Sequence, residues 1–281
     1  IKSRKKQKQK IKSRKHSRKQ RNYNQNNKNI RAAIIPHAGE EYSGQARQSV
    51  FKKMNKNIKY IIYIGTIHKL NPNDDVYILH ENKQSKFRLP ESINQKPVPY
   101  DEHSFAWVEN EIRSYFKNAE ILAFGPNKYN KALKDWIVSF MKNHHDCILF
   151  STTDLIHYGE NFNNVNYLEY QQQVKKQEKE QELINELVQK LLKPRTINNI
   201  IDSDRNLMCG PEAIKLFVCV IKDLDYSGKV VDYYDSHNSK KEDLLNRYTI
   251  FPESVLHFVS YVSIIYGKNI NQEEINDFDI M

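Results

Sequence analysis

Three short apolar runs in this chain each lead into a histidine. The runs and the histidines that follow them are 32–35 with His37, 60–64 with His68, and 147–150 with His157. Runs this apolar predict strands that are covered on both faces of a sheet. Because ligands of open α/β sheets lie beyond the carboxyl ends of the strands, we expect the three histidines to meet at one edge of the sheet.

The rest of the chain alternates strand-like with helix-like patterns, which predicts one α/β domain. Further strands are expected at 76–79, 121–124, 229–234 and 259–266, and helices at about 44–55, 105–116, 132–141, 166–192 and from 211 onward. Residues 81–100 are polar and contain proline, so we expect a surface loop there. Ser104 is the expected N-cap of the helix that follows it.

The net charge of +10 is unevenly distributed. The first 39 residues hold 14 of the 44 Lys and Arg and no acidic residue, so the remainder is mildly acidic. We therefore expect a disordered basic tail over 1–30, a folded domain over 31–268 and a frayed acidic end over 269–281. We expect no nucleic-acid partner except through this tail, and a solvated extension without function is the favoured interpretation of the tail.

The cysteine count and the lengths of the apolar segments indicate the cellular compartment. Three unevenly spaced cysteines do not make a disulfide framework, which is typical of a reducing compartment. The N-terminus has no apolar segment of the signal-peptide kind, and no apolar run is long enough for a bilayer. The sequence therefore predicts a cytoplasmic protein without a membrane partner, with nuclear location as the variant that the basic tail would add.

Two of the histidines and one cysteine predict a metal site with open positions. Imidazole and thiolate suit iron, copper and zinc, and His37, His68 and Cys209 provide three such ligands. Cys209 precedes an expected helix, whose dipole should lower the pKa of its thiol. His157 would transfer a proton next to the metal and Asp154 would orient an imidazole, so these two are the candidate catalytic residues.

Each of these residues has a plainer interpretation when taken singly. A lone histidine after a strand is more often a loop residue, and a lone cysteine is more often a small core residue, as we expect for Cys147 and Cys219. A zinc hydrolase is disfavoured because the chain lacks a His-Glu-x-x-His motif. The combination of three histidines after strands with a cysteine at a helix start favours the metal site.

Five short motifs resemble the Memo family, which is linked to cell motility and is similar in fold to class III extradiol ring-cleavage dioxygenases. In chain order they are Pro36-His-Ala-Gly39 with Tyr42-Ser-Gly44, Ile64-Gly-Thr-Ile-His68, Asp101-Glu-His-Ser104, Ser151-Thr-Thr-Asp-Leu-Ile-His157 and Met208-Cys-Gly210. The resemblance runs from about Arg31 to Tyr266. It implies a single α/β domain with a central mixed β-sheet flanked by helices.

The resemblance also implies a function. The positions of His37, His68 and Cys209 hold Fe(II) or copper in the family, and those of Asp154 and His157 line the same pocket. The expected function is iron- or copper-dependent redox activity, as an oxidoreductase linked to cell motility signalling, with a phosphotyrosine peptide or signalling protein as partner. Because Ala106 and Val108 replace the family's usual Glu and His, the alternative is a non-catalytic interaction or metal-sequestering protein with a diverged pocket.

Overall fold

The fold of the 281-residue chain is known from a computed structural model. It describes residues 29–68, 74–79, 89–91, 93, 95–98, 102–155, 157–159, 186–192, 208–236, 257–268 and 270. The expectations for the basic tail, for 166–185 and for nearly all of the C-terminal end lie outside these residues.

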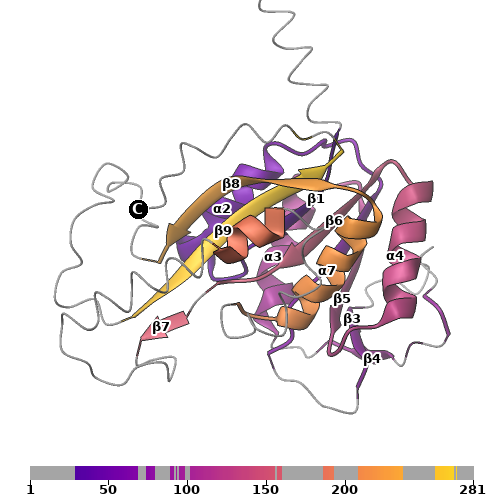
Figure 1. The fold of residues 1–281 in the computed structure, drawn as a ribbon, viewed down its shortest axis with the longest axis horizontal. Coiled ribbons are helices and arrows are strands. Elements are labelled where there is room, and N and C mark those ends of the chain that lie inside the picture. The colour runs from indigo at the N-terminus through magenta and orange to yellow at the C-terminus, as the bar shows by residue number, and fades with distance from the viewer. Residues whose placement is uncertain are drawn as a thin grey trace, which may run out of the picture.

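The centre of the described fold is one mixed β-sheet (Figure 1). Its strands are β1 (Ile30–Ile35), β2 (Tyr60–Ile64), β3 (Val76–Leu79), β4 (Gln95–Pro97), β5 (Glu120–Pro126), β6 (Cys147–Thr152), β7 (His157–Gly159), β8 (Ser227–Asp235) and β9 (His257–Gly267). They follow the order β4-β3-β5-β2-β6-β1-β9-β7, and β8 pairs with β9. Parallel and antiparallel pairs occur together, so the expected mixed α/β sheet is confirmed.

The middle of the sheet is parallel and brings three strand ends together. β6 lies between β2 and β1 and pairs in parallel with both, with Ile64 opposite Ser151 and Ile34 opposite Ser151 on the other side. All three strands are almost completely buried, which explains their uninterrupted apolar sequences. Their carboxyl ends therefore lie at one edge, where the loops carrying His37, His68 and Asp154 begin.

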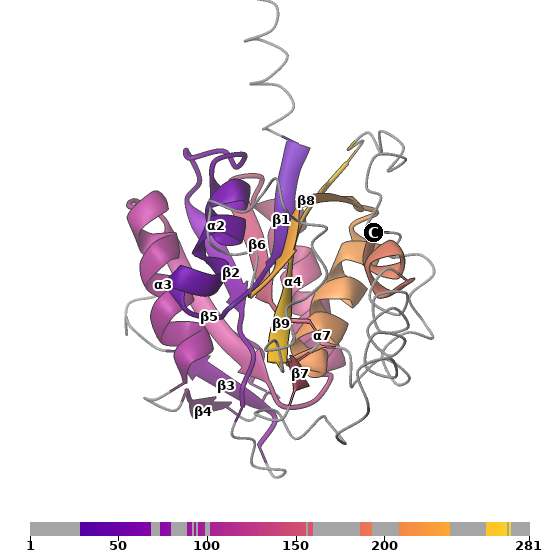
Figure 2. The ribbon, with the colours of Figure 1, turned by 90° about the vertical axis from the view of Figure 1, so that its left-hand side faces the viewer.

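Helices cover both faces of the sheet (Figure 2). They are α2 (Glu40–Phe51) and α3 (His103–Tyr115) on one face, and α4 (Lys131–Asn143) and α7 (Pro211–Asp223) on the other. Each face has its own apolar core, and residues 187–192 of a further helical segment pack into the core on the α4 and α7 side. Alternate residues of β2 supply both cores, with Ile62 and Ile64 on one side and Ile61 and Tyr63 on the other.

The structure differs from the sequence predictions in β4, in the start of α3 and in β7, an unpredicted strand that begins at His157. Residues 95–97 of the expected surface loop form β4, a short strand at the edge beside β3. Helix α3 begins at His103 rather than after Ser104, because its N-cap is Glu102, whose side chain accepts a hydrogen bond from the Ser104 backbone N–H. The Ser104 hydroxyl donates instead to the carbonyl of Thr66, at 2.5 Å. Helix α3 is thereby tied to the loop that carries His68.

Candidate metal centre

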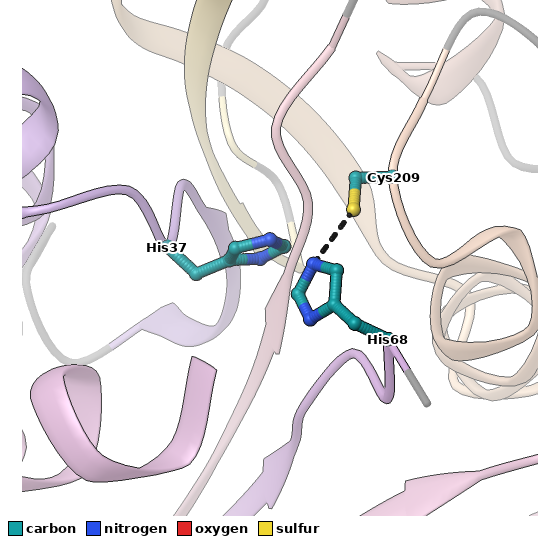
Figure 3. A group of neighbouring side chains, drawn as sticks. All are labelled: His37, His68 and Cys209. Atoms are coloured by element: carbon teal, nitrogen blue, oxygen red, sulfur yellow. Dashed lines mark hydrogen bonds between the residues drawn. The ribbon is translucent and has the colours of Figure 1, made fainter. Parts of the chain in front are cut away.

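Three metal-ligating side chains from distant parts of the chain meet beyond the strand ends (Figure 3). His37 follows β1, His68 follows β2, and Cys209 precedes α7. One donor atom from each lies within 4.8 Å of the other two. This separation is close to the span of two metal–ligand bonds of about 2.0–2.3 Å each. The three residues predicted as ligands are therefore brought together by the fold.

His37 is a buried imidazole with one unpartnered nitrogen. Its side chain is 1 % exposed, and its Nδ1 atom has no hydrogen-bond partner among the described residues. Burial, and then the nearby His68 and His103, lower the pKa of His37 well below its usual value. A buried polar atom without a partner is costly, and a neutral imidazole nitrogen is a good metal ligand. The environment of His37 therefore fits a bound metal.

The backbone of the His37 loop is held from two sides. The Asp154 carboxylate accepts a hydrogen bond from the backbone N–H of His37 at 2.8 Å. On the other side the guanidinium of Arg47 on α2 donates to the carbonyls of Pro36 and Ala38. Arg47 is fully buried and also forms a two-pronged ion pair with Glu111 on α3. Arg47 was not singled out from the sequence, where it lies in a polar stretch of a helix.

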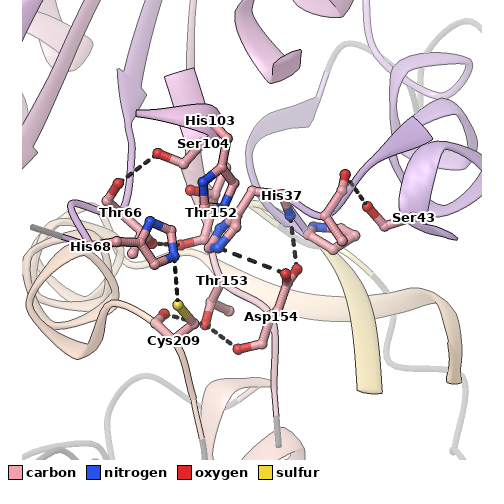
Figure 4. Close-up of polar contacts among 12 residues, drawn as sticks. His37, Ser43, Thr66, His68, His103, Ser104, Thr152, Thr153, Asp154 and Cys209 are labelled. Atoms are coloured by element: carbon pink, nitrogen blue, oxygen red, sulfur yellow. Dashed lines mark hydrogen bonds and ion pairs between the residues drawn. The ribbon is translucent and has the colours of Figure 1, made fainter. Parts of the chain in front are cut away.

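The Asp154 carboxylate contacts the imidazole ring of His37 as well as its backbone N–H. The second carboxylate oxygen, Oδ2, lies 3.7 Å from Nε2 of His37, and the residue is 3 % exposed. Burial raises the pKa of Asp154, and the N–H donated by His37 acts in the opposite direction. The geometry thus puts the carboxylate of Asp154 against both the backbone and the ring of His37 (Figure 4), and its predicted role in orienting an imidazole stays a prediction.

Cys209 is fixed through its backbone to the end of β6. Its N–H donates to the carbonyl of Asp154 at 2.8 Å, and its carbonyl accepts from the Thr153 hydroxyl at 2.7 Å. Burial, and then the charges of Asp154 and Glu102, raise the pKa of the thiol to about 12. The predicted lowering by the helix dipole is therefore wrong, because desolvation and two nearby carboxylates outweigh it. Without a metal, Cys209 is a thiol at neutral pH.

Gly210 lets Cys209 and the His68 loop approach closely. It is the N-cap of α7 with a left-handed backbone, φ 69°, and a Cβ atom at this position would collide with the side chain of Thr66. We expect Gly210→Ala to lower the free energy of unfolding by about 2–4 kcal/mol, from backbone strain plus overpacking. Because Thr66 precedes His68 by two residues, metal affinity should fall as well. Chemical denaturation and metal titration measure the two effects.

The matched control is Gly39→Ala, since Gly39 is the N-cap of α2. Its φ is −50°, and the atoms nearest to an added Cβ would be those of the flexible Glu41 side chain, at 3.2–3.3 Å. We expect a change in unfolding free energy below about 1 kcal/mol. Equal effects of the two substitutions would contradict the steric role of Gly210.

His68 lies beside Cys209 (Figure 4), and its other ring nitrogen contacts a buried carboxylate, Glu102. Its Nε2 lies 3.1 Å from Sγ of Cys209, and its Nδ1 lies 2.7 Å from Oε1 of Glu102. The backbone N–H of His68 donates to the other oxygen of Glu102 at 2.8 Å. Burial raises the pKa of Glu102, but the hydrogen bonds from His68 prevail and hold it at about 2. Glu102 is part of the motif Asp101-Glu-His-Ser104, but the sequence pattern predicted no role for it.

A second cluster, His68 with Glu102 and His103, fits a metal less well. The imidazole of His103 stacks on that of His68, with ring centroids 4.3 Å apart and planes 26° apart. Imidazole lone pairs lie in the ring plane, so two nearly parallel stacked rings do not aim at one ion. His103 also contacts the ring of Trp107, which is 50 % exposed. His103 therefore lies over one face of the His68 ring.

His157 lies in β7, near enough to the cluster to affect its charges. Its Nδ1 hydrogen-bonds the carbonyl of Leu155 at 3.0 Å, and a positive charge on it acts on both His37 and Asp154. The carbonyl partner fixes the proton on Nδ1 when the ring is neutral and leaves Nε2 for other contacts. Its predicted role in proton transfer stays a prediction.

A mixed α/β sheet with two histidines and a cysteine converging at its parallel strand ends defines a protein with a candidate metal centre. A sequence model described as Memo-like protein matches residues 101–245, just over half of the chain. The chain belongs to the Memo-like family. The match includes Asp154, His157 and Cys209, whereas His37 and His68 precede it.

Two further comparisons were made. A search of curated proteins found no match. Among solved structures, a similar one is an uncharacterized protein, JW3007, from Escherichia coli K12, with 10% sequence identity and a TM-score of 0.45 over 84% of this chain and 99% of that one. Within the described part of this chain, none of the helices combines the length and the apolar character needed to traverse a bilayer.

Proposed function

We propose that the protein binds iron or copper through His37, His68 and Cys209 and carries out redox chemistry at that metal. The observation that carries this proposal is the convergence of the three donor atoms within 4.8 Å, with Nδ1 of the buried His37 unpartnered among the described residues. Two neutral imidazoles and a thiolate suit both metals, and three protein ligands leave a position for a substrate.

The chain's own residues would supply binding, orientation and proton transfer. The Asp154 carboxylate holds the His37 loop by accepting a hydrogen bond from the backbone N–H of His37. Cys209 is fixed by hydrogen bonds with Asp154 and Thr153. His157, hydrogen-bonded to Leu155, would accept or donate a proton beside the substrate. Bound iron or copper would supply electron transfer to and from a substrate or dioxygen.

The test combines metal content with oxygen consumption. Protein purified without oxygen is reconstituted with Fe(II) or Cu(I), and bound metal and oxygen uptake with a reductant are measured on the same sample. We expect about one metal per chain together with oxygen uptake that depends on the reductant. Absence of metal under both conditions would refute the proposal.

A metal-sequestering protein is the second candidate. It is favoured by the stacking of His103 on His68, which covers one side of the cluster, and by the replacement of pocket residues at Ala106 and Val108. Stoichiometric metal without oxygen uptake in the same experiment would select this function over redox catalysis.

The wider roles remain proposals that rest on the family resemblance. These are a link to cell motility signalling, a phosphotyrosine peptide or signalling protein as partner, and a location in the cytoplasm or nucleus. Recovery of partners on phosphotyrosine peptides, compared with the unphosphorylated peptides, tests the partner; equal recovery would contradict it.

Metal affinity is expected to rise with pH. Because the pKa of the Cys209 thiol is about 12, metal binding must release its proton, whereas His37 is already neutral. One released proton makes the association constant increase about tenfold per pH unit between about pH 7.5 and pH 9. Competition titrations with a chelator of known pH dependence measure the slope. A slope near zero would contradict thiolate ligation.

A further inference from the structure

We propose that Glu102 is a positioning residue for the metal centre. Its carboxylate fixes the proton of His68 on Nδ1, and the lone pair of Nε2 is then left facing Cys209. The inference rests on the proposed function, because His68 is one of the proposed ligands. It gives a role to a carboxylate that lies outside the ligand set and makes three hydrogen bonds at the edge of the site.

The three hydrogen bonds of the Glu102 side chain point to a carboxylate that accepts and does not donate, and Nδ1 of His103 lies farther away, 3.8 Å from Oε1. Oε2 accepts from the backbone N–H of His68 at 2.8 Å, and Oε1 lies 2.7 Å from the Nδ1 atom of the same residue. Oε1 also accepts from the Ser104 backbone N–H at 3.3 Å. Because the two backbone groups are obligatory donors, Nδ1 completes the set as a third donor.

The carboxylate is held rigidly in this position. Glu102 is 5 % exposed, and the helix that it caps is attached to the loop of His68 by the Ser104 hydroxyl, which donates to the Thr66 carbonyl at 2.5 Å. On the other side of Ser104, its carbonyl accepts from the hydroxyl of the buried Tyr63. Glu102 and His68 therefore keep their relative position through three segments of the fold.

A neutral imidazole carries one proton, so the partner of one nitrogen decides the state of the other. With the proton on Nδ1, the Nε2 atom of His68 presents its lone pair toward Sγ of Cys209, 3.1 Å away. With the proton on Nε2, the same atom would have to lose it before a metal bound. The hydrogen bond to Glu102 thus selects the tautomer that is competent to bind metal.

The substitution Glu102→Gln tests this selection with a side chain of the same shape. Either orientation of the amide puts its NH₂ group against one backbone donor, the N–H of His68 or that of Ser104. Because the hydrogen bond from His68 is the shorter one, at 2.8 Å against 3.3 Å, we expect the amide oxygen to keep it, and the amide NH₂ then faces Nδ1. A donor at that place requires Nδ1 to become an acceptor, and the proton moves to Nε2. We expect metal affinity to fall about 10–100-fold.

The primary readout is the tautomer of His68 in the metal-free protein, from the two ring ¹⁵N shifts assigned by comparison with a His68→Gln variant. The second readout is metal affinity. The matched control is Glu109→Gln, which changes a carboxylate on α3, the helix that Glu102 caps, whose partner is Arg113. We expect the control to leave the tautomer of His68 and the metal affinity unchanged.

The expected result is a proton on Nδ1 in the wild type that moves to Nε2 in Glu102→Gln, with weaker metal binding. A proton on Nε2 in the wild type, or an unchanged tautomer in the variant, would overturn the inference, and metal binding by the wild type would still uphold the proposed function. If the wild type binds no metal, the proposed function fails, and the tautomer in the metal-free protein still decides the role of Glu102. A role limited to capping α3 would lower the melting temperature without moving the proton.

Discussion

Cys209→Ala is expected to weaken metal binding by more than about 100-fold, because loss of a ligand exceeds the 10–100-fold effect of losing an outer partner. The thiol lies 3.1 Å from Nε2 of His68 and belongs to the cluster of three donors. The pH dependence of the remaining affinity should also flatten, since no thiol proton is left to be released. Metal titration of the variant at two pH values measures both effects.

Cys219→Ala is the matched control for this prediction. Cys219 lies on α7, ten residues after Cys209, is partly exposed and is not in the cluster of donors. Its removal should leave the metal affinity unchanged. Wild-type affinity in Cys209→Ala, or equal losses in both variants, would contradict the assignment of Cys209 as a ligand.

Arg47→Ala is expected to lower the free energy of unfolding by about 3–5 kcal/mol, the range for breaking a buried ion pair by removing one partner. The guanidinium is completely buried and bonds Glu111, the carbonyls of Pro36 and Ala38, and the Ser43 hydroxyl. Removing it leaves these acceptors without their donor and opens a cavity beside the His37 loop. Denaturant unfolding monitored by circular dichroism measures the loss.

An exposed ion pair provides the contrast. Lys131 pairs with Asp135 on α4 at 2.5 Å, and both side chains are exposed. Exposed pairs of this kind contribute about 0.5 kcal/mol or less, so Lys131→Ala should change stability little. Similar losses in Arg47→Ala and Lys131→Ala would contradict the structural role of the buried guanidinium.

The sequence predicted the bounds of two strands closely. The bounds of β2 and β3 agree with the predicted residues 60–64 and 76–79, because apolar runs between turn residues leave little choice of strand ends. The edge strand β4 was missed, since three residues containing a proline resemble a loop and acquire strand form only by pairing with β3.

The candidate site likewise contains residues that could be predicted from the sequence and residues that could not. Its potential ligands were predictable because histidines after apolar runs and a cysteine before a helix follow local patterns. The supporting residues were not, because Arg47 and Glu102 act on partners that are distant in sequence, Glu111 and His68. The error in the pKa of Cys209 has the same origin: a helix start is visible in the sequence, whereas burial and two carboxylates brought near by folding are not.

The spread of the donors along the chain bears on biosynthesis. The cluster takes one donor from residue 37, one from residue 68 and one from residue 209, and β1 pairs with β9, which ends at Gly267. During synthesis from the N-terminus, no nascent fragment that stops before Cys209 contains all three donors, and β1 gains its second neighbour only when β9 leaves the ribosome. The proposed metal site would therefore be completed late relative to β1, β2 and β6, and a metal bound through all three donors would enter only after Cys209 has been made.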